Sequence, residues 1–372
     1  ARGGGLRGAL HGLWNTPHLL FGQQLAEWRL QLGRILFAAG LAAYEISVVF
    51  CNSMARQNWA WVQGVMSPVL EWLAFLCFGA KILFGTRYTW RELLAGGALY
   101  FIARWVYFNS QNIWWVGIVV AVLAAKDVPL RRPLQVYFAS GCAAMAVVLA
   151  LHFAGIVAPD LTSERMGALR GTYGYGHPNT FGGLVFGLVL AYALLRAQKV
   201  RWVDCLLVFA VGVFLLVGPA SRSAALCTLA LAVGLVFCRL RAGHSVSRWW
   251  PGTCAGMVGL TAAVSYLLPL LVIKVGPWNN DIGPAWLAKL DSLLTCRISL
   301  TWMAYRLLDV KIAGQVFNWP TVDNSFAFAL FQFGPVVAAL LGILFAAALW
   351  GHAKQGRRVE VCCLFAMLAY AY

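Results

Sequence analysis

Acidic residues are scarce in this chain, and so are charged residues of any kind. Asp and Glu together number 13 among 372 residues, and all charged residues make up 11% of the sequence. Soluble domains carry roughly 25% charged residues, so an ordinary soluble globular protein is excluded. No polar stretch is long enough to form a separate soluble domain.

Paired cysteines and metal-ligand motifs are also lacking. The ten cysteines include no C-x-x-C, and only Cys51 and Cys296 are expected on an oxidising outer side. A disulfide framework needs paired cysteines in such a compartment, so we interpret these residues as buried thiols. The outer connections contain no D-x-D and no metal-ligand spacing, and we expect neither a metal ion nor a cofactor. The chain begins without Met and stops inside an apolar run, so we expect it to be a piece of a longer protein.

Long apolar runs are the main feature that is present. Hydrophobic residues reach 61%, and each run has about 17–25 residues, the length that an α-helix needs to cross the hydrocarbon core. The sequence therefore predicts an all-α polytopic membrane protein with about eleven transmembrane helices. We expect one integral membrane domain over residues 1–372. The expected spans are 32–50, 63–83, 92–108, 113–128, 134–158, 181–197, 202–218, 224–240, 252–274, 325–350 and 359–372.

Basic residues recur on alternate connections between these runs, and they orient the chain. Cytoplasmic loops retain Lys and Arg, so the N-terminus is predicted to be cytoplasmic. Anionic lipid headgroups attract short juxtamembrane clusters of this kind, and the net charge of +16 therefore does not indicate nucleic-acid binding. The inner clusters are Arg2/Arg7/Arg29/Arg34, Lys81/Arg87/Arg91, Lys126/Arg131/Arg132, Arg196/Lys199/Arg201, Arg239/Arg241/Arg248 and Lys354/Arg357/Arg358.

Ten basic residues remain on or near the outer side, against the topology signal. An anionic ligand on the outer face is one explanation and chance exposure is the other. We assign Arg56, Lys274 and Lys289 to chance exposure. The ten residues are Arg56, Arg104, Arg165, Arg170, Arg222, Lys274, Lys289, Arg297, Arg306 and Lys311.

The outer connection 159–180 is glycine-rich and reads SERMGALRGTYGYGHPNTFGG near its end. Its glycines let the backbone approach a ligand closely. Asn179 or Thr180 is predicted to cap the following helix, whose N-terminus would point outward and could bind phosphate or diphosphate. A flexible surface loop is the alternative, but it would need no histidine. Three ionisable residues bracket the helix start: Arg165, Arg170 and His177.

Arg222 lies in the tight connection GPASR, between two apolar runs. A guanidinium at the membrane boundary is costly unless it pairs or reaches the interface, and a functional role is the default hypothesis there. Snorkelling of the side chain toward water is the competing explanation.

The outer connection 275–324 is predicted to contain one amphipathic helix, Leu290–Ile312. Arg297 falls in the middle of its apolar stripe, whereas Arg306 falls on the opposite, polar face. Arg306 is therefore explained as a solvated charge, and Arg297 is the basic residue most suited to a function. The stripe is formed by Leu293, Leu300, Ala304 and Leu308, and the polar face by Thr295, Ser299, Trp302 and Asp309.

A rare outer carboxylate, Asp323, precedes the next span. Either Asp323 or Asn324 could cap the helix that follows, which is a routine structural role. Alternatively, Asp323 could be a general base at the membrane surface. Both interpretations stay open from the residues alone.

Four segments together resemble the O-antigen ligase and polysaccharide polymerase superfamily of bacterial envelope glycosyltransferases. They are RGTYGYGHPNTFGG, SRSAAL, LLTCRISLTWMAYRLLDVKIAGQ and DNSFAFALFQFGPVVAALLGILF, within residues 165–345. GHPNTFG is more similar to the exopolysaccharide or capsule polymerase branch. The related ligases carry a proposed histidine base where this chain has Asp323 and Asn324, which also favours the polymerase.

The resemblance implies a metal-independent glycosyltransferase with a helical membrane (GT-C-like) architecture, in the bacterial cytoplasmic membrane with its site on the outer face. Its substrates would be oligosaccharide repeat units linked to a polyprenyl diphosphate such as undecaprenyl diphosphate, as donor and acceptor. Membrane lipids, a flippase and a chain-length regulator are the implied partners. On this reading Arg297 and either Asp323 or His177 are catalytic. Diphosphate binding would fall to Arg222, Arg170, Arg165 and Asn179.

Two other functions are consistent with the residues. A ligase would keep the chemistry and transfer the glycan to lipid A-core, teichoic acid or protein. A transporter of lipid-linked sugars or anions would need ionisable residues at the bilayer midplane, where Glu45 and Glu71 are the main candidates. No internal repeat supports transport.

Overall fold

The computed structural model describes residues 18–19, 27–157, 163–165, 168–241, 243, 245, 247–272, 284–294, 296–317 and 322–371. This part of the chain is almost entirely helical, as a polytopic membrane protein must be, because a helix satisfies its own backbone hydrogen bonds in lipid. Four short strands, each of two or three residues, form two antiparallel pairs: β1 (His18–Leu19) with β2 (Arg87–Tyr88), and β3 (Ser163–Arg165) with β4 (Ala168–Arg170).

Seven helices of the described residues are long and apolar enough to cross a membrane. The prediction of an all-α polytopic membrane protein is thus confirmed, whereas the count of eleven spans stays a prediction. The seven are α2 (Glu27–Cys51), η1 with α4 (Val62–Met66 and Ser67–Phe84), α7 (Arg131–Phe153), α8 (Pro178–Arg196), α10 (Arg222–Leu240), α11 with η2 (Trp250–Leu267 and Leu268–Leu271) and α15 (Pro335–Lys354).

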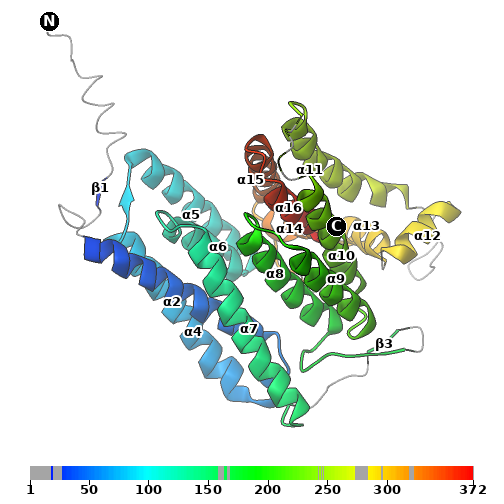
Figure 1. Ribbon diagram of the computed structural model, residues 1–372, viewed down its shortest axis with the longest axis horizontal. Helices are drawn as coiled ribbons and strands as arrows, with labels where there is room; N and C mark the ends of the chain where they lie inside the picture. Colours follow the sequence, from blue (N-terminus) through cyan, green and yellow to red (C-terminus); the bar gives the residue numbers. More distant parts are fainter. Residues whose placement is uncertain are drawn as a thin grey trace, which may run out of the picture. The chain divides into compact units, whose positions relative to one another are not determined.

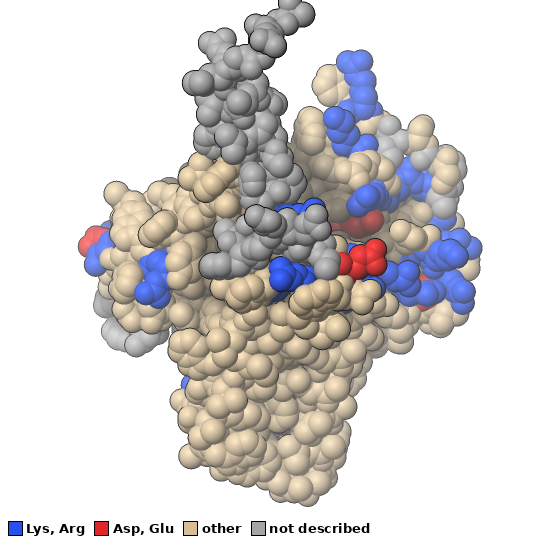
Figure 2. Space-filling view, turned by 90° about the vertical axis from the view of Figure 1, so that its left-hand side faces the viewer, with Lys and Arg blue, Asp and Glu red and all other residues tan. Residues whose placement is uncertain are grey.

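The other expected spans also coincide with helices, which are shorter or less apolar. These and the remaining helices are α3 (Ala55–Asn58), α5 (Trp90–Ser110), α6 (Ile113–Ala124), α9 (Trp202–Val217), α12 (Ala285–Leu293), α13 (Arg297–Leu307), α14 (Ser325–Phe333) and α16 (Arg358–Ala371). Figure 1 follows their order along the chain. Large apolar side chains such as Trp72, Phe101 and Val203 are exposed. Figure 2 shows a broad surface area almost without charged side chains, as lipid-facing helices require.

The chain divides into two compact units. The first comprises Ala1–Arg104, Ile113–Lys199 and Leu206–Leu229, and the second comprises Trp105–Asn112, Val200–Cys205 and Ala230–Tyr372. In the first unit α2 packs along α4 and α7, and α7 packs along α8. Gly40 makes the first contact close, since a Cβ there would lie 2.9 Å from the ring of Phe78.

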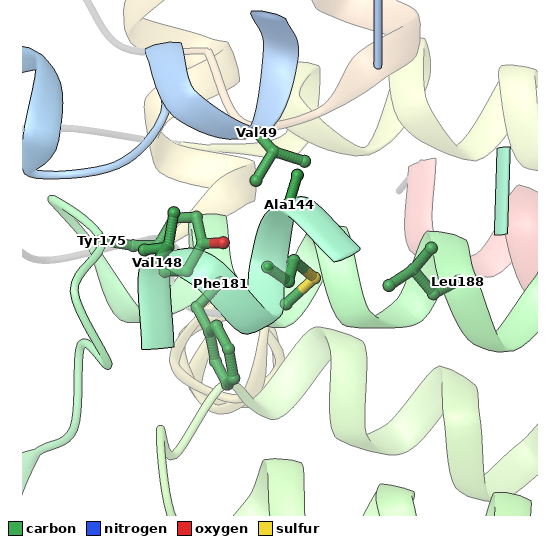
Figure 3. Close-up of a cluster of buried hydrophobic side chains, with 7 residues drawn as sticks. Val49, Ala144, Val148, Tyr175, Phe181 and Leu188 are labelled. Carbon is green, nitrogen blue, oxygen red and sulfur yellow. The ribbon is translucent and has the colours of Figure 1, made fainter. Parts of the chain in front are cut away.

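A cluster of buried side chains joins α2, α7, α8 and the connection before α8 (Figure 3). It consists of Val49, Ala144, Met145, Val148, Tyr175, Phe181 and Leu188. In the second unit α11 packs on α15, and Cys254, Val258, Leu349 and Ala353 form part of its core. Both cores are apolar because dispersion contacts between closely fitting helices stabilise packing inside a bilayer.

Lys81, which belongs to one of the basic clusters predicted on the cytoplasmic side, is buried and not solvated. Lys81 is 2% exposed, and its Nζ donates to the Thr86 hydroxyl at 2.9 Å and to the Lys126 carbonyl at 2.7 Å. Its ammonium therefore ties the end of α4 to the connection after α6, because a buried ammonium needs hydrogen-bond acceptors.

Two predicted helices are broken. The span expected at 325–350 divides into α14 and α15 at Gly334, whose φ is +84° and which precedes a proline. The helix expected at Leu290–Ile312 divides into α12 and α13, with Cys296 at φ +66° before α13. The single-helix predictions were wrong because periodicity does not register a local change of backbone conformation.

Candidate functional site

The N-terminus of α8 is capped by His177. This residue has extended backbone (φ −151°, ψ 141°), and its Nδ1 accepts the backbone N–H of Asn179 at 3.1 Å. The helix begins at Pro178, whose fixed φ suits the first helical position. The prediction that Asn179 or Thr180 is the cap was wrong, because both already lie inside the helix. A ring nitrogen that accepts carries no proton, so the neutral imidazole keeps its proton on Nε2.

Arg170 holds the glycine-rich connection against the turn before α10. It is 8% exposed. Its Nε donates to the Pro219 carbonyl at 3.2 Å, and its Nη2 donates to the Ala220 carbonyl at 3.1 Å and to Asn179 Oδ1 at 2.9 Å. A planar guanidinium can serve several fixed acceptors at once, which suits it to hold a turn. Arg170 and Asn179, both expected at the site, are in direct contact.

The turn Gly218–Ser221 is fitted closely to this connection. The Gly171 N–H donates to the Gly218 carbonyl at 3.3 Å, and Ala220 adopts a positive φ of 48°. Gly182 of α8 faces Ser221, and any Cβ at Gly182 would overlap the serine side chain. The starts of α8 and α10 therefore lie side by side.

Two tyrosines anchor the segment between β4 and α8. Tyr173 stacks on Phe181 with ring centroids 5.0 Å apart, and Tyr175 is completely buried. The Gly174 carbonyl accepts the N–H of Met54 at 2.8 Å, which attaches the segment to the end of α2. Positive φ values at Tyr173 and Gly174 make this path possible. The segment is thus a packed part of the first unit.

Two further arginines were expected here. Arg222 is the first residue of α10 and is half-buried. Arg165 ends β3 and pairs with Ala168 of β4, while its side chain lies outside the described residues. The first unit therefore brings together Arg170, Asn179 and His177, with Arg222 directly after the turn that Arg170 holds.

In the second unit Arg297 opens α13 and is half-buried. The carboxylate of Asp291, which is 1% exposed, accepts the N–H groups of Ile298 at 2.8 Å and Ser299 at 3.1 Å. Asp291 thus caps α13 from the preceding helix and occupies its positive end. Sequence reasoning gave Asp291 no role, because its partners became apparent only with the break at Cys296.

The face of α13 that packs inward differs from the predicted stripe. Ile298, Thr301 and Ala304 are buried, whereas Leu293, on α12, is 73% exposed. Arg306 is exposed and lies over the ring of Trp302 at 5.7 Å, so its interpretation as a solvated charge is confirmed. Thr295 lies outside the described residues.

Asn324 caps α14, and Asp323 does not. The Oδ1 of Asn324 accepts the N–H groups of Phe326 at 3.0 Å and Ala327 at 3.1 Å, and Asn324 is 2% exposed. Asp323 is exposed. The cap of α14 is thus the amide of Asn324, and the role of Asp323 as a general base stays a prediction.

The second half of α13 packs on α14. Ala304, Val322, Ala327 and Phe331 share one buried cluster, whereas Ile298 near the start of α13 packs with Val272 and Leu287. Seven residues, about 10 Å of helix, separate Arg297 from Ala304 along the axis. Asp323 follows Val322 of this cluster and therefore lies closer to the C-terminal half of α13 than to Arg297 at its N-terminus.

An apolar groove of about 570 Å³ lies between α11, α14 and α15. Small and apolar side chains line it, among them Ala262, Phe326, Ala338 and Ile343. An adjoining hollow of about 250 Å³ includes Ser325, the first residue of α14. Asp323 thus precedes, by two residues, a residue that lines the apolar hollow.

Within the described ranges, no group of three His, Cys, Asp or Glu side chains is placed to hold a metal ion. Comparisons of the chain with models of protein families, with curated proteins and with solved structures found no match.

Proposed function

We propose that the chain polymerises oligosaccharide repeat units linked to a polyprenyl diphosphate, at the outer face of the bacterial cytoplasmic membrane. The donor glycan leaves its diphosphate and joins a sugar hydroxyl of the acceptor unit. About eleven spans, with the N-terminus inside, carry this site. The observation that carries the proposal is the meeting of the segments 168–171 and 177–179 with the turn at 218–222; Arg170 reaches acceptors 49 and 50 residues further along the chain.

Charge supports an anionic substrate at this place. Arg222 stands at the N-terminus of α10, where the helix dipole also favours an anion. Arg170 contributes to the site by positioning the turn, since it donates three hydrogen bonds to protein acceptors. We propose that Arg165 of the first unit also binds diphosphate and that Arg297 of the second unit stabilises the departing diphosphate, because a guanidinium group can bind phosphoryl oxygens in a bidentate manner.

Capping by His177 favours Asp323 as the base. The Nδ1 of His177 accepts a backbone N–H, so its neutral ring can donate from Nε2 but has no second lone pair for a proton. Asp323 is exposed, and its neighbour Asn324 provides the helix cap. We propose that Asp323 accepts the hydroxyl proton and that His177 orients the first turn of α8 and the diphosphate.

The apolar groove between α11, α14 and α15 suits the polyprenyl chain. Mostly apolar side chains line it, and Ser325 is among the residues that line the neighbouring hollow. A carrier bound there would bring its diphosphate to the start of α14, because the head group of a lipid lies at the membrane surface.

Reconstitution in proteoliposomes with lipid-linked repeat units tests the proposal. Polymer ladders on a gel are the expected product, and their absence with every acceptor contradicts the proposal. Transfer of a preformed glycan to a different acceptor, with no ladder, indicates a ligase. Movement of intact lipid-linked units across the bilayer, with no new glycosidic bond, indicates a transporter.

Ala338→Trp tests the groove. The indole would fill space at a position that lines both hollows. We expect a higher KM for donors with long polyprenyl chains than for donors with short ones. Leu344→Trp is the control, since Leu344 is 54% exposed and lines neither hollow.

A further inference from the structure

We propose that Glu45 forms a binding site for a monovalent cation, H⁺ or Na⁺, inside the helices of the first unit. The site lies between α2, α7 and α8, next to the buried cluster that contains Tyr175 and against which Tyr137 packs. It is separate from the glycosyl-transfer site proposed above, and its test does not depend on that proposal.

Glu45 lies level with the middle of the neighbouring helices α7 and α8. A Cβ on Gly141 would be 3.1 Å from Glu45 Oε1 and 2.7 Å from Leu188 Cδ2. Gly141 is the eleventh of 23 residues in α7, and Leu188 is the eleventh of 19 in α8. The absence of a side chain at Gly141 is what makes room for the carboxylate.

The carboxylate is buried and has no protein partner in the described part of the chain. Glu45 is 6% exposed, and neither a hydrogen bond nor an ion pair to it is present among these residues. An isolated carboxylate in a low-dielectric interior is strongly destabilising unless it is neutralised. A bound proton or a small cation supplies that neutralisation.

A second observation points to the same place. Tyr175 is completely buried, and its Oη has no hydrogen-bond partner among the described residues. Tyr175 belongs to the same buried cluster as Val49 and Ala144 (Figure 3), which lie one helical turn from Glu45 and Gly141 respectively. Burial, and next the charge of Glu45, raise the pKa of the Tyr175 hydroxyl above its usual range, so this hydroxyl stays neutral.

Other polar groups around the site are neutral or acidic. The hydroxyl of Tyr137 lies against α8, because a Cβ on Gly187 would be 2.6 Å from it. On the α4 side, the Ser47 hydroxyl lies 3.2 Å from Ser67 Oγ and 3.4 Å from Glu71 Oε1, and its one hydrogen can be donated to either oxygen. The hydroxyl of Tyr44 lies near Gly117 of α6 and also has no hydrogen-bond partner in the described part of the chain. Oxygen atoms of this kind are ligands that suit Na⁺ or a hydrogen-bonded carboxylic acid.

Labelling with a hydrophobic carbodiimide tests the site, because this reagent modifies protonated carboxyl groups in apolar surroundings. In the reconstituted full chain, mass spectrometry of peptides should find one adduct at Glu45, which declines as the pH rises. Glu45→Gln should remove the adduct. Glu71→Gln, which changes a half-buried carboxylate with a serine donor, should leave the Glu45 adduct unchanged.

Sodium distinguishes the two ligands. Protection from labelling by NaCl, but not by choline chloride, identifies Na⁺, and we then expect Na⁺ to raise the Tm of the wild type and not that of Glu45→Gln. Labelling that depends on pH alone identifies H⁺. No adduct at Glu45 at any pH, or an adduct insensitive to both pH and Na⁺, overturns the proposal.

Discussion

Gly314 and Gly334 pack backbone against backbone. A Cβ on Gly314 would overlap the Gln332 carbonyl, and a Cβ on Gly334 would overlap the Ile312 carbonyl. Both residues have positive φ, at +73° and +84°. The segment after α13 is thereby locked against the break between α14 and α15. This contact brings together two of the segments that carry the resemblance to envelope glycosyltransferases.

Substitution of either glycine should therefore destabilise the second unit. We expect Gly314→Ala and Gly334→Ala each to lower the free energy of unfolding by about 1–3 kcal/mol or more, from strain and overlap. Thermal unfolding of the purified protein in detergent measures this. Gly351→Ala is the control, because a Cβ at that position meets nothing within 4 Å. Equal Tm values for all three variants would contradict the packing.

Substitution of His177 separates capping from proton transfer. Asparagine is a good N-cap but a poor base, so His177→Asn should keep most of the polymerising activity and stability. His177→Ala should cost about 1 kcal/mol of stability, as loss of a cap usually does. Polymer ladders and Tm are compared at matched expression. A folded but inactive His177→Asn, together with an active Asp323→Ala, would make His177 the base.

Arg170 should behave as a structural residue. Lysine cannot reproduce its three hydrogen bonds to Pro219, Ala220 and Asn179, so Arg170→Lys should resemble Arg170→Ala. We expect a loss of about 2–3 kcal/mol, since buried acceptors of a charged donor lose their partner. Thermal unfolding and proteolysis of the connection before α8 provide the measurement. Normal stability combined with a raised KM would assign Arg170 to the substrate instead.

Arg297 and Arg306 should differ in their effect on activity. Arg297→Ala should reduce polymer formation about 10²-fold or more, if its guanidinium stabilises the departing diphosphate. Arg297→Lys should restore little activity, because an ammonium cannot bind phosphoryl oxygens in a bidentate manner. Arg306→Ala should cost at most about 1 kcal/mol of stability, the contribution of an exposed cation–π contact. Polymer length is compared on gels for the three variants at matched expression. Normal ladders from Arg297→Ala would show that Arg297 is not part of the site.

Single cysteines test the predicted topology. Gly176 and Gln355 are exposed, and neither has a positive φ. With the N-terminus inside, Gly176→Cys should react with an impermeant thiol reagent added outside intact cells, whereas Gln355→Cys should react only after permeabilisation. Gly174 is unsuitable, because its φ is +83° and a Cβ would lie 3.1 Å from His152. The opposite labelling pattern would invert the topology and move the candidate site to the cytoplasm.

The sequence by itself determined the class of protein and most of its helices. Span length is a local property, because the bilayer sets how many apolar residues a helix needs, and most of the expected spans coincide with helices. Local patterns, however, could not reveal the breaks at Cys296 and Gly334, since a few residues with positive φ leave the hydrophobic period unchanged.

Only the tertiary structure decided what each polar group does. Arg170 was expected to bind diphosphate, but its donors meet carbonyls 49 and 50 residues away in the sequence. Asp291 caps a helix that was not expected to begin at Arg297, and the carboxylate of Glu45 fits because Gly141, on another helix, has no side chain. The physical reason is the same in each case. A hydrogen bond or an unpaired buried charge depends on atoms that folding brings from distant parts of the chain, and no local pattern contains them.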